Sequence, residues 1–531
     1  MKIKKYPLIL IIFIGFSLFF KVDFRLQDDI YCCSDDSDYF MHSETIVEDF
    51  DFDYSNQLGV YDESRFFKNK SAPIGFPGTG IFAAPFMLLG IYLDKVLLNL
   101  FNLELEITNF KIYFYSISSI FYILISINLL TKTMDILKIK YNPFHIFIYF
   151  LGSGVTYYAL ERYSMTHAYE VFSMSIIIYL SAYFFSNNRK NYLMIFLISF
   201  FIVLGFYVKW VYFYIFLLPL IIKSLFFKES KKSLYLTPTF LLTFSGFLFL
   251  ALILSEKIYG EFTLNASTVY GKNLATIAVQ NTTENIVYIF DLLKNFIIIL
   301  FTQEFGLLWF QPIVFISTII IIYNFFSGLI KKNVKSSDIL LILSFAQVFL
   351  IQAMWESTGS SYGFRYVVNL TPIALIVFYA NKEKINLKKL SNVLIYLSVF
   401  SFFSTLFFET TVDTQLSLEK SLNSFGKMSW YSQKDYLSGY LHSFLSFDAY
   451  LKIFITSYLG LLILKPIIFI FSITSVNATF NKLGLPINNE KFQILMEKAD
   501  QISGIYYIVV LISIIFFVNI IYKTTFKEKS S

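Results

Sequence analysis

The chain has 531 residues, of which 56% are hydrophobic and only 15% are charged, and its formal net charge is +6. An average soluble domain is about 45–50% apolar and about 25% charged, so this composition excludes an ordinary soluble protein. Apolar runs near the roughly 20 residues that span a bilayer recur along the sequence, which predicts an all-α polytopic membrane protein. The positive charge comes mainly from lysines in short loops, so we expect no nucleic-acid partner. The adjacent Cys32 and Cys33 are too few for a disulfide framework or a structural zinc site.

The first predicted membrane helix covers the apolar run at residues 6–20. No small-residue cleavage site follows this run, so we interpret it as an uncleaved helix and not as a signal peptide. Lys2, Lys4 and Lys5 place the N-terminus in the cytoplasm by the positive-inside rule. The acid-rich stretch after the helix then belongs to a first outside loop, residues 21–108.

The densest part of this acid-rich stretch is SDDSDYF, residues 34–40, which contains Asp35, Asp36 and Asp38. A carboxylate at the outer end of a membrane helix can serve as a general base or as a cation ligand. Neighbouring carboxylates raise one another's pKa and can keep a base close to neutrality. The alternative interpretation is a solvated acidic loop without a chemical role.

Short lysine-rich loops set the predicted topology of the remaining chain, because the positive-inside rule places all of them in the cytoplasm. These loops are 132–140, 189–190, 223–232, 331–335 and 382–389. The predicted spans are 109–130, 143–160, 168–186, 192–208, 211–227, 234–255, 307–329, 338–354, 367–380 and 390–408. The alternation holds only if the apolar segments 79–101 and 286–302 do not cross. We therefore predict a juxtamembrane or re-entrant helix for the first and an interfacial helix for the second.

Three outside turns carry cationic candidates in a chain where arginine is scarce. Glu161, Arg162 and His167 gather in a short turn, Lys209 lies in the next one, and Arg365 follows WESTGSSYGF at the outer end of a later span. The planar guanidinium group binds phosphate oxygens bidentately, so the arginines are candidates for a phosphate contact. The alternative is that they extend to lipid headgroups without further function.

Five segments, taken in order, resemble bacterial integral-membrane glycosyltransferases of the GT-C fold, near the family that includes protein O-mannosyltransferases and the lipid A aminoarabinose transferase. SDDSDYF is similar to the acidic motif of the family's first outside loop, although Asp36 stands where Glu is usual and Asp38 where His or Arg is frequent. The other four segments are PIGFPGTGIFAAPF, ERYSMTHAYEVF, QEFGLLWFQP and GSSYGFRYVVNLTP. The resemblance covers roughly residues 1–380.

The resemblance implies a GT-C-like fold with roughly 11–14 membrane helices. Residues 1–408 would form the catalytic membrane module, and residues 409–531 a further outside loop with additional membrane helices. The implied activity is inverting transfer of a sugar from a polyprenyl-phosphate donor to a lipid, glycan or protein acceptor. The implied location is the extracytoplasmic face of a bacterial cytoplasmic membrane.

The same resemblance implies roles for individual side chains. Asp35 and Asp36 are the expected catalytic carboxylates, with Asp35 as the base. Asp38 and Glu161 are expected to bind the acceptor or a cation, and a divalent cation on Asp35, Asp36 and Asp38 is left open. The residues expected to contact the donor phosphate are Arg365, Arg162, Lys209 and His167.

Two other classes of membrane protein are alternatives. A polytopic transporter or a lipid or glycan flippase would show ionisable residues in mid-span or inverted repeats with broken helices. Few of the former and none of the latter are evident in the sequence. A surface-glycan polymerase or ligase would favour a large basic outside loop late in the chain, and the loop 409–448, with His442, is only weakly basic.

Overall fold

The computed structural model describes the chain from residue 34 to residue 406 with gaps. The described ranges are 34–58, 66–67, 70–101, 110–187, 191–209, 211–230, 232–264, 294–301, 306–354, 363–382 and 388–406, with isolated positions after 444. The first apolar run, Cys32, Cys33 and nearly all of 409–531 lie outside the described residues.

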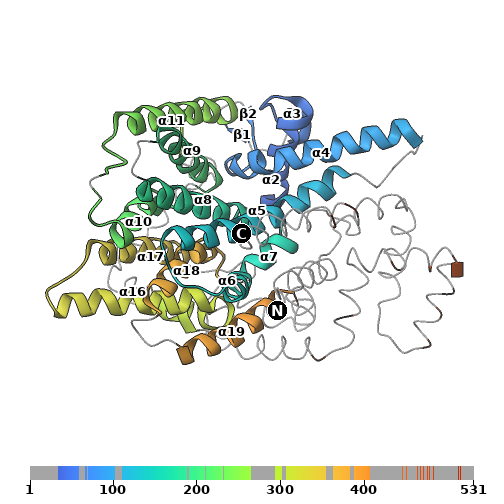
Figure 1. Cartoon of the computed structure of the whole chain (residues 1–531). Coiled ribbons are helices and arrows are strands. Elements are labelled where there is room, and N and C mark those ends of the chain that lie inside the picture. The colour runs from blue at the N-terminus through green and yellow to red at the C-terminus, as the bar shows by residue number, and fades with distance from the viewer. Residues whose placement is uncertain are drawn as a thin grey trace, which may run out of the picture.

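The described residues are mostly helical (Figure 1). Six of their helices are long and apolar enough to cross a membrane. Such helices satisfy every backbone polar group internally, as a bilayer requires. The structure therefore supports a membrane-embedded helical protein, while the expected total of roughly 11–14 spans stays a prediction.

The elements follow one another in a simple order along the chain. An antiparallel pair of two-residue strands, β1 (Phe66–Phe67) and β2 (Lys70–Ser71), interrupts the helices. The helical elements are α2 (Ser34–Glu44), η2 (Thr45–Asp49), α3 (Ser55–Leu58), α4 (Gly78–Phe101), α5 (Phe110–Ile136), α6 (Pro143–Phe150), η4 (Leu151–Val155), α7 (Thr156–Leu160), α8 (His167–Ser186), α9 (Tyr192–Val208), η5 (Phe213–Phe216), α10 (Leu218–Phe226), α11 (Pro238–Tyr259), α15 (Leu307–Phe310), α16 (Pro312–Ile330), α17 (Ser336–Met354), η7 (Arg365–Leu370), α18 (Thr371–Asn381) and α19 (Lys388–Leu406).

Local sequence explains where several helices begin. The side chains of Asn142 and Thr237 accept hydrogen bonds from the backbone N–H groups of Phe144 and Phe240, and each is followed by a proline in the first helical turn. Capping side chains satisfy N–H groups that have no partner inside the helix, and proline has no N–H to satisfy. Gly260 ends α11 in the left-handed conformation, at φ 72°.

The predicted single span at 143–160 is wrong in detail, because the structure breaks it into α6, η4 and α7. Gly152 and Gly154 leave helical geometry inside η4, and Gly154 has φ 82°. The broken turn is buried throughout, so its irregular backbone faces protein and not lipid.

The predicted spans 211–227 and 367–380 are also divided. Each opens with a short 3₁₀ helix, η5 or η7, and continues as the α-helix α10 or α18. Both α-helices have a proline in their first turn, which cannot donate a backbone hydrogen bond to the preceding turn.

The apolar segment predicted at 79–101 forms the 24-residue helix α4, which is one of the six helices long enough to cross a membrane. Its juxtamembrane or re-entrant course, which the lysine pattern requires, stays a prediction. Within the second such segment, 286–302, the structure describes only 294–301, which is helical.

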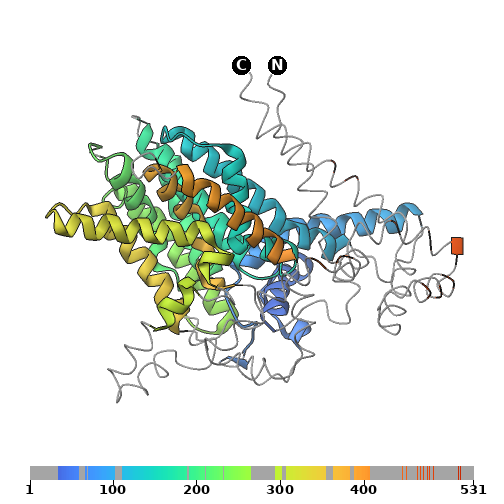
Figure 2. The same cartoon turned by 90° about the horizontal axis from the view of Figure 1, so that it is seen from below.

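Helix α5 is the centre of the part of the bundle that carries the site, with α4 and α8 packed against it and α2 lying on α4. Figure 2 shows α4 extending beyond the side of the bundle.

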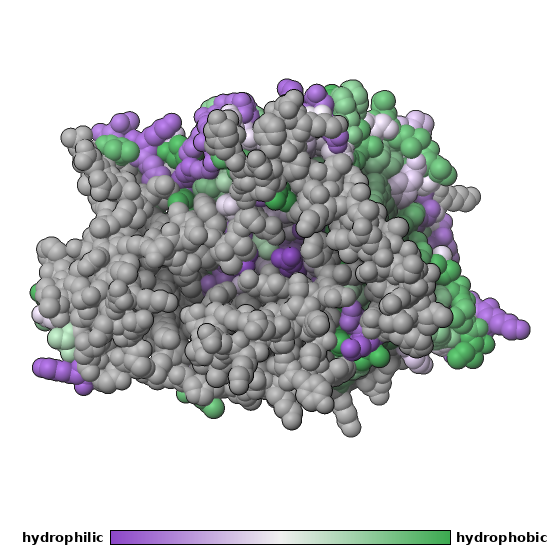
Figure 3. Space-filling view, turned by 180° about the vertical axis from the view of Figure 1, so that it is seen from behind, coloured by the Kyte–Doolittle hydropathy of each residue, from purple (hydrophilic) through white to green (hydrophobic). Residues whose placement is uncertain are grey.

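Apolar side chains are exposed on the outside of the bundle, such as Leu242 on α11 and Ile330 on α16. Figure 3 shows apolar side chains gathered along one side of the molecule. Exposed apolar helix faces of this kind suit contact with lipid tails.

Candidate functional site

The acid-rich stretch predicted as a loop forms helix α2 and is mostly buried. Asp36 is 3% exposed and Asp38 is fully buried. Asp35 belongs to the first turn of α2, but its side chain lies outside the described part of the structure. At the other end of α2, Lys111 Nζ lies 2.5 Å from Glu44 Oε1 and joins α2 to α5. The solvated-loop alternative is therefore wrong for Asp36 and Asp38.

Asp36 is held by the turn that connects α7 to α8. Arg162 Nη2 lies 2.8 Å from Asp36 Oδ2, and both side chains are only 4% exposed. Ser164 Oγ, in the same turn, donates to the backbone carbonyl of Asp36 at 2.6 Å. The Tyr115 hydroxyl on α5 lies 2.7 Å from Ser164 Oγ. Two segments far apart in the sequence thus form one buried ionic and hydrogen-bonded contact.

Asp38 contacts the Pro/Gly-rich segment that leads into α4. Its Oδ2 accepts a hydrogen bond from the backbone N–H of Ile74 at 2.8 Å. One turn further along α2, His42 Nε2 donates to the carbonyl of Gly75 at 3.0 Å, and its Nδ1 lies 2.6 Å from the Tyr54 hydroxyl. These hydrogen bonds hold the Pro/Gly-rich segment against α2. Nothing in the sequence indicated this role for His42.

A second buried cluster surrounds His167 at the start of α8. His167 Nδ1 lies 3.2 Å from Glu170 Oε1, and Thr166 Oγ1 donates to the same oxygen at 2.5 Å. Asn369 Nδ2 donates to Glu170 Oε2 at 3.2 Å. The Tyr214 hydroxyl in turn donates to Asn369 Oδ1 at 2.8 Å. Both oxygens of the Glu170 carboxylate are therefore occupied by polar partners, as a buried charge requires.

The cationic candidates Arg365 and Lys209 meet at one aromatic ring. The Arg365 guanidinium lies 5.2 Å from the centre of the Tyr366 ring, and Lys209 Nζ lies 5.6 Å from the same centre. The His167 ring lies 6.4 Å from the Tyr366 ring, edge to face. Arg365 and Lys209 are only partly buried, so they can meet a ligand that the deeper groups cannot reach.

Glu161 caps the C-terminal end of α7 directly before Arg162 and is 5% exposed.

The segment QEFGLLWFQP contacts the segment that contains Arg365, because Gln311 Nε2 donates to the carbonyl of Phe364 at 3.1 Å. All five segments identified in the sequence thus contribute described residues to one continuous region. Residues 359–362, at the start of the last segment, lie outside the described part.

Sequence reasoning missed Glu170, Asn369, Tyr214 and Tyr366, the groups that orient the candidate residues. Glu170 lies three residues after His167, which is one helical turn, and this spacing was a usable signal. Asn369 and Tyr214 gave no signal, because only the packing of η7 against α8 and the fold of η5 bring them to Glu170.

The described residues contain no group of three or more His, Cys, Asp or Glu side chains arranged to hold a metal ion. Asp36 already has a cationic partner in Arg162, and Asp38 accepts a backbone hydrogen bond. The Asp35 carboxylate is not among the described side chains, and a cation bound by all three aspartates stays a prediction.

The chain matches no model of a known protein family, and neither the curated proteins nor the solved structures with which it was compared give a match. A function for this protein is therefore inferred from its residues and their geometry alone.

Proposed function

We propose that this protein is a membrane glycosyltransferase of the GT-C type, which transfers a sugar from a polyprenyl-phosphate donor on the extracytoplasmic face of a bacterial cytoplasmic membrane. The observation that supports it is the buried Asp36–Arg162 ion pair, which joins the acidic helix α2 to the turn before His167. The ring of His167, which follows this turn, contacts the ring of Tyr366, and the partly exposed Arg365 and Lys209 lie beside that ring. A carboxylate-bearing helix and a cationic surface thus belong to one connected region.

In this proposal Asp35 accepts the proton of the acceptor hydroxyl. The acceptor oxygen bonds to the anomeric carbon while the bond from that carbon to the phosphate oxygen breaks, through a transition state with oxocarbenium character. The phosphate leaves with the bonding electron pair, and the product sugar has inverted configuration. Because phosphate is a good leaving group, the protein needs to supply positive charge and not an acid.

Arg365 and Lys209 supply that positive charge. Both are partly exposed beside Tyr366, where they can meet the phosphate of a lipid lying against the bundle. Cations that face charge developing on a leaving oxygen stabilise the transition state, and guanidinium groups bind phosphate through two parallel hydrogen bonds. His167, held by Glu170, supports the Tyr366 ring from the protein side.

Arg162 takes a positioning role in this proposal, in place of the phosphate contact expected from the sequence. Its guanidinium is buried and paired with Asp36, so it fixes the start of α2 and with it the backbone that carries Asp35. Asp38 fixes the Pro/Gly segment against the same helix through Ile74. Glu161 and this segment are candidates for contact with the acceptor.

Binding of undecaprenyl phosphate to the purified full-length protein, followed by native mass spectrometry, tests the proposal. We expect saturable binding that Arg365→Ala weakens by about tenfold or more, the loss of a charge-assisted bidentate contact. Lys132→Ala is the matched control, because Lys132 is an exposed cation near the other end of α5. Equal loss in the control, or no saturable binding by a folded sample, would refute the phosphate site and favour a transporter.

Asp35→Asn separates catalysis from donor binding. It should abolish sugar transfer in a membrane assay and leave undecaprenyl phosphate binding unchanged, because it removes the base and keeps the side-chain shape. Asp51→Asn, the same change at an exposed position of the same acid-rich segment, should transfer at the wild-type rate. Near-normal turnover by Asp35→Asn would contradict the assignment of the base.

A further inference from the structure

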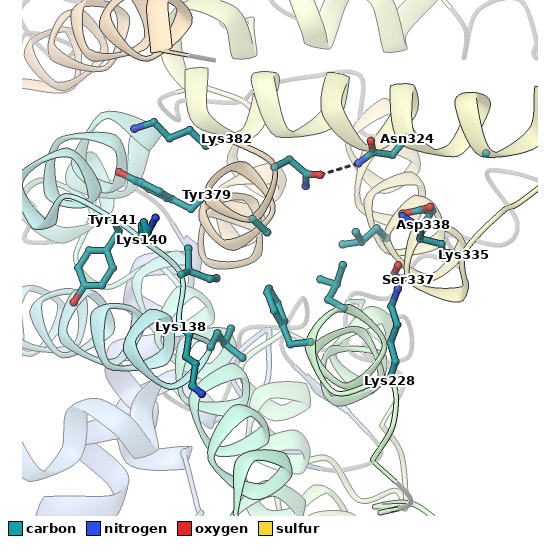
Figure 4. Close-up of a pocket in the computed structure, with 18 of the residues that line it drawn as sticks. Lys138, Lys140, Tyr141, Lys228, Asn324, Lys335, Ser337, Asp338, Tyr379 and Lys382 are labelled. Atoms are coloured by element: carbon teal, nitrogen blue, oxygen red, sulfur yellow. Dashed lines mark hydrogen bonds between the residues drawn. The ribbon is translucent and has the colours of Figure 1, made fainter. Parts of the chain in front are cut away.

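A second polar region lies at the other end of the bundle. Between the ends of several helices the structure contains a cavity of about 1180 Å³ (Figure 4). Cavities that hold small molecules typically have volumes of about 300–1,000 Å³, so this one can admit a ligand with several charged groups. Helix α5 links the two regions: it starts at Phe110 beside α2 and ends at Ile136, just before the cavity-lining Leu137.

The lining of the cavity is strongly basic. Its six lysines lie in the turns and loops next to helix ends. Among the described lining residues Asp338 is the only acid, so positive charge is in large excess. Figure 4 labels Lys138, Lys140, Lys228, Lys335 and Lys382, which lie around the opening and are not gathered on one side. The six lysines are Lys138, Lys140, Lys228, Lys331, Lys335 and Lys382.

Membrane topology explains lysines at this end, since the positive-inside rule places them in the cytoplasm, and lysines also suit helix C-termini. It does not explain the polar groups deeper in the cavity wall. The Tyr379 hydroxyl and His145 Nδ1 are buried atoms that have no hydrogen-bond partner among the described residues. Buried polar atoms normally have a partner, which here points to a ligand or water in the cavity.

We propose that this cavity binds a phosphate-bearing anion. Several lysines around one space repel one another, and burial already lowers the pKa of the Lys382 ammonium. A multiply charged anion reduces the repulsion between the lysines and offsets the cost of burying the Lys382 charge. Lysine binds phosphate as a compact point charge. The Tyr379 hydroxyl can donate to a phosphate oxygen. The source is either a soluble cytoplasmic phosphate compound or the headgroup of an anionic lipid, and the site is independent of the proposed transferase activity.

Two probes distinguish the sources, both applied to the full-length protein. Inorganic pyrophosphate, titrated by calorimetry in detergent, represents the soluble class. Lipid retention, measured by native mass spectrometry from nanodiscs of phosphatidylcholine with or without phosphatidylglycerol, represents the headgroup class. The variants are Lys228→Gln, an exposed loop position that leaves packing intact, and Lys382→Gln. The control is Lys132→Gln, an exposed lysine near the same end that does not line the cavity.

We expect saturable binding of one probe, weakened about tenfold by each cavity variant and unchanged in the control, as for the loss of one charge-assisted contact. Pyrophosphate binding would identify a soluble ligand, and retained phosphatidylglycerol would identify a lipid headgroup. The proposal is overturned if neither probe binds saturably. It is also overturned if Lys132→Gln weakens binding as much as Lys228→Gln, because general surface charge would then be the cause.

Discussion

At the scale of single residues, the Asp36–Arg162 pair shows how a charged site is kept inside an apolar bundle. Both side chains are almost fully buried, so each has lost most of its hydration. Removing one partner of a buried ion pair leaves an uncompensated charge and typically costs about 3–5 kcal/mol. The pair therefore fixes α2 against the turn after α7 more by the penalty for breaking it than by net attraction.

Asp36→Asn should lower the free energy of unfolding by about 3 kcal/mol, because Arg162 is left buried without an anion. Arg162→Gln should have a similar effect for the reverse reason. In the double variant both charges are absent, so the combined loss should be clearly smaller than the sum of the two. Denaturant unfolding in detergent measures all four proteins, and additive losses would mean that the two groups do not interact.

His42 is the second residue whose environment sets a measurable property. Burial lowers its pKa from 6.5 to about 4, although its bond to the Gly75 carbonyl acts in the opposite direction. The folded state therefore keeps His42 neutral where the unfolded chain binds a proton. The associated stability is complete above the unfolded pKa of 6.5 and is lost as the pH falls toward 4.

The contribution of His42 to stability should thus fall by about 3 kcal/mol between these two pH values. His42→Gln should reduce the pH dependence in this window, because the amide can still bond Gly75 and Tyr54 but does not titrate. The comparison is the midpoint of unfolding of both proteins at several pH values. Parallel curves would show that other groups cause the acid sensitivity.

At the scale of elements, glycines decide how closely helices approach. A Cβ on Gly80 of α4 would lie 2.5 Å from the Cβ of His42 on α2, and a Cβ on Gly78 would lie 2.4 Å from the backbone of Tyr207. Similarly, a Cβ on Gly152 would lie 2.3 Å from the carbonyl oxygen of Ser398 on α19. Close approach of backbones through small residues is typical of helix packing in membranes.

Gly80→Ala should push α2 away from α4, lower the unfolding temperature and reduce any activity that depends on α2. Gly246→Ala is the matched control, because a Cβ at Gly246 on α11 meets nothing within 4 Å. Alanine is the better helix former by about 0.5–1 kcal/mol, so the control should be neutral or slightly stabilising. Equal effects of the two changes would mean that α2 is not packed on α4 through Gly80.

At the scale of the whole molecule, the described part of the bundle has two polar ends of different character. Helix α5 has 27 residues, so it is about 40 Å long and separates them. One end carries the acidic helix α2 with the candidate site, and the other carries the lysine-lined cavity. The positive-inside rule predicts that the lysine-rich end faces the cytoplasm.

Cysteine labelling in intact cells tests this orientation. In a background with Cys32 and Cys33 replaced by serine, Ser55→Cys near α2 should react with a membrane-impermeant maleimide. Ser336→Cys at the start of α17 should react only after the cells are opened. Both serines are exposed, and the substitution is the same at each position. Labelling of Ser336→Cys in intact cells would reverse the topology.

The sequence by itself determined the class of protein, because apolar runs and loop lysines respond to a bilayer without any tertiary contact. It also singled out Asp36, Arg162 and Arg365 as unusual charges at helix ends. Only the tertiary structure decided that Asp36 pairs with Arg162 and that Asn369 donates to Glu170. It also decided that the span at 143–160 breaks at Gly152 and Gly154. Such features depend on which helices lie side by side. The sequence of an apolar run does not specify which helix packs against it, because hydrophobic burial is not directional.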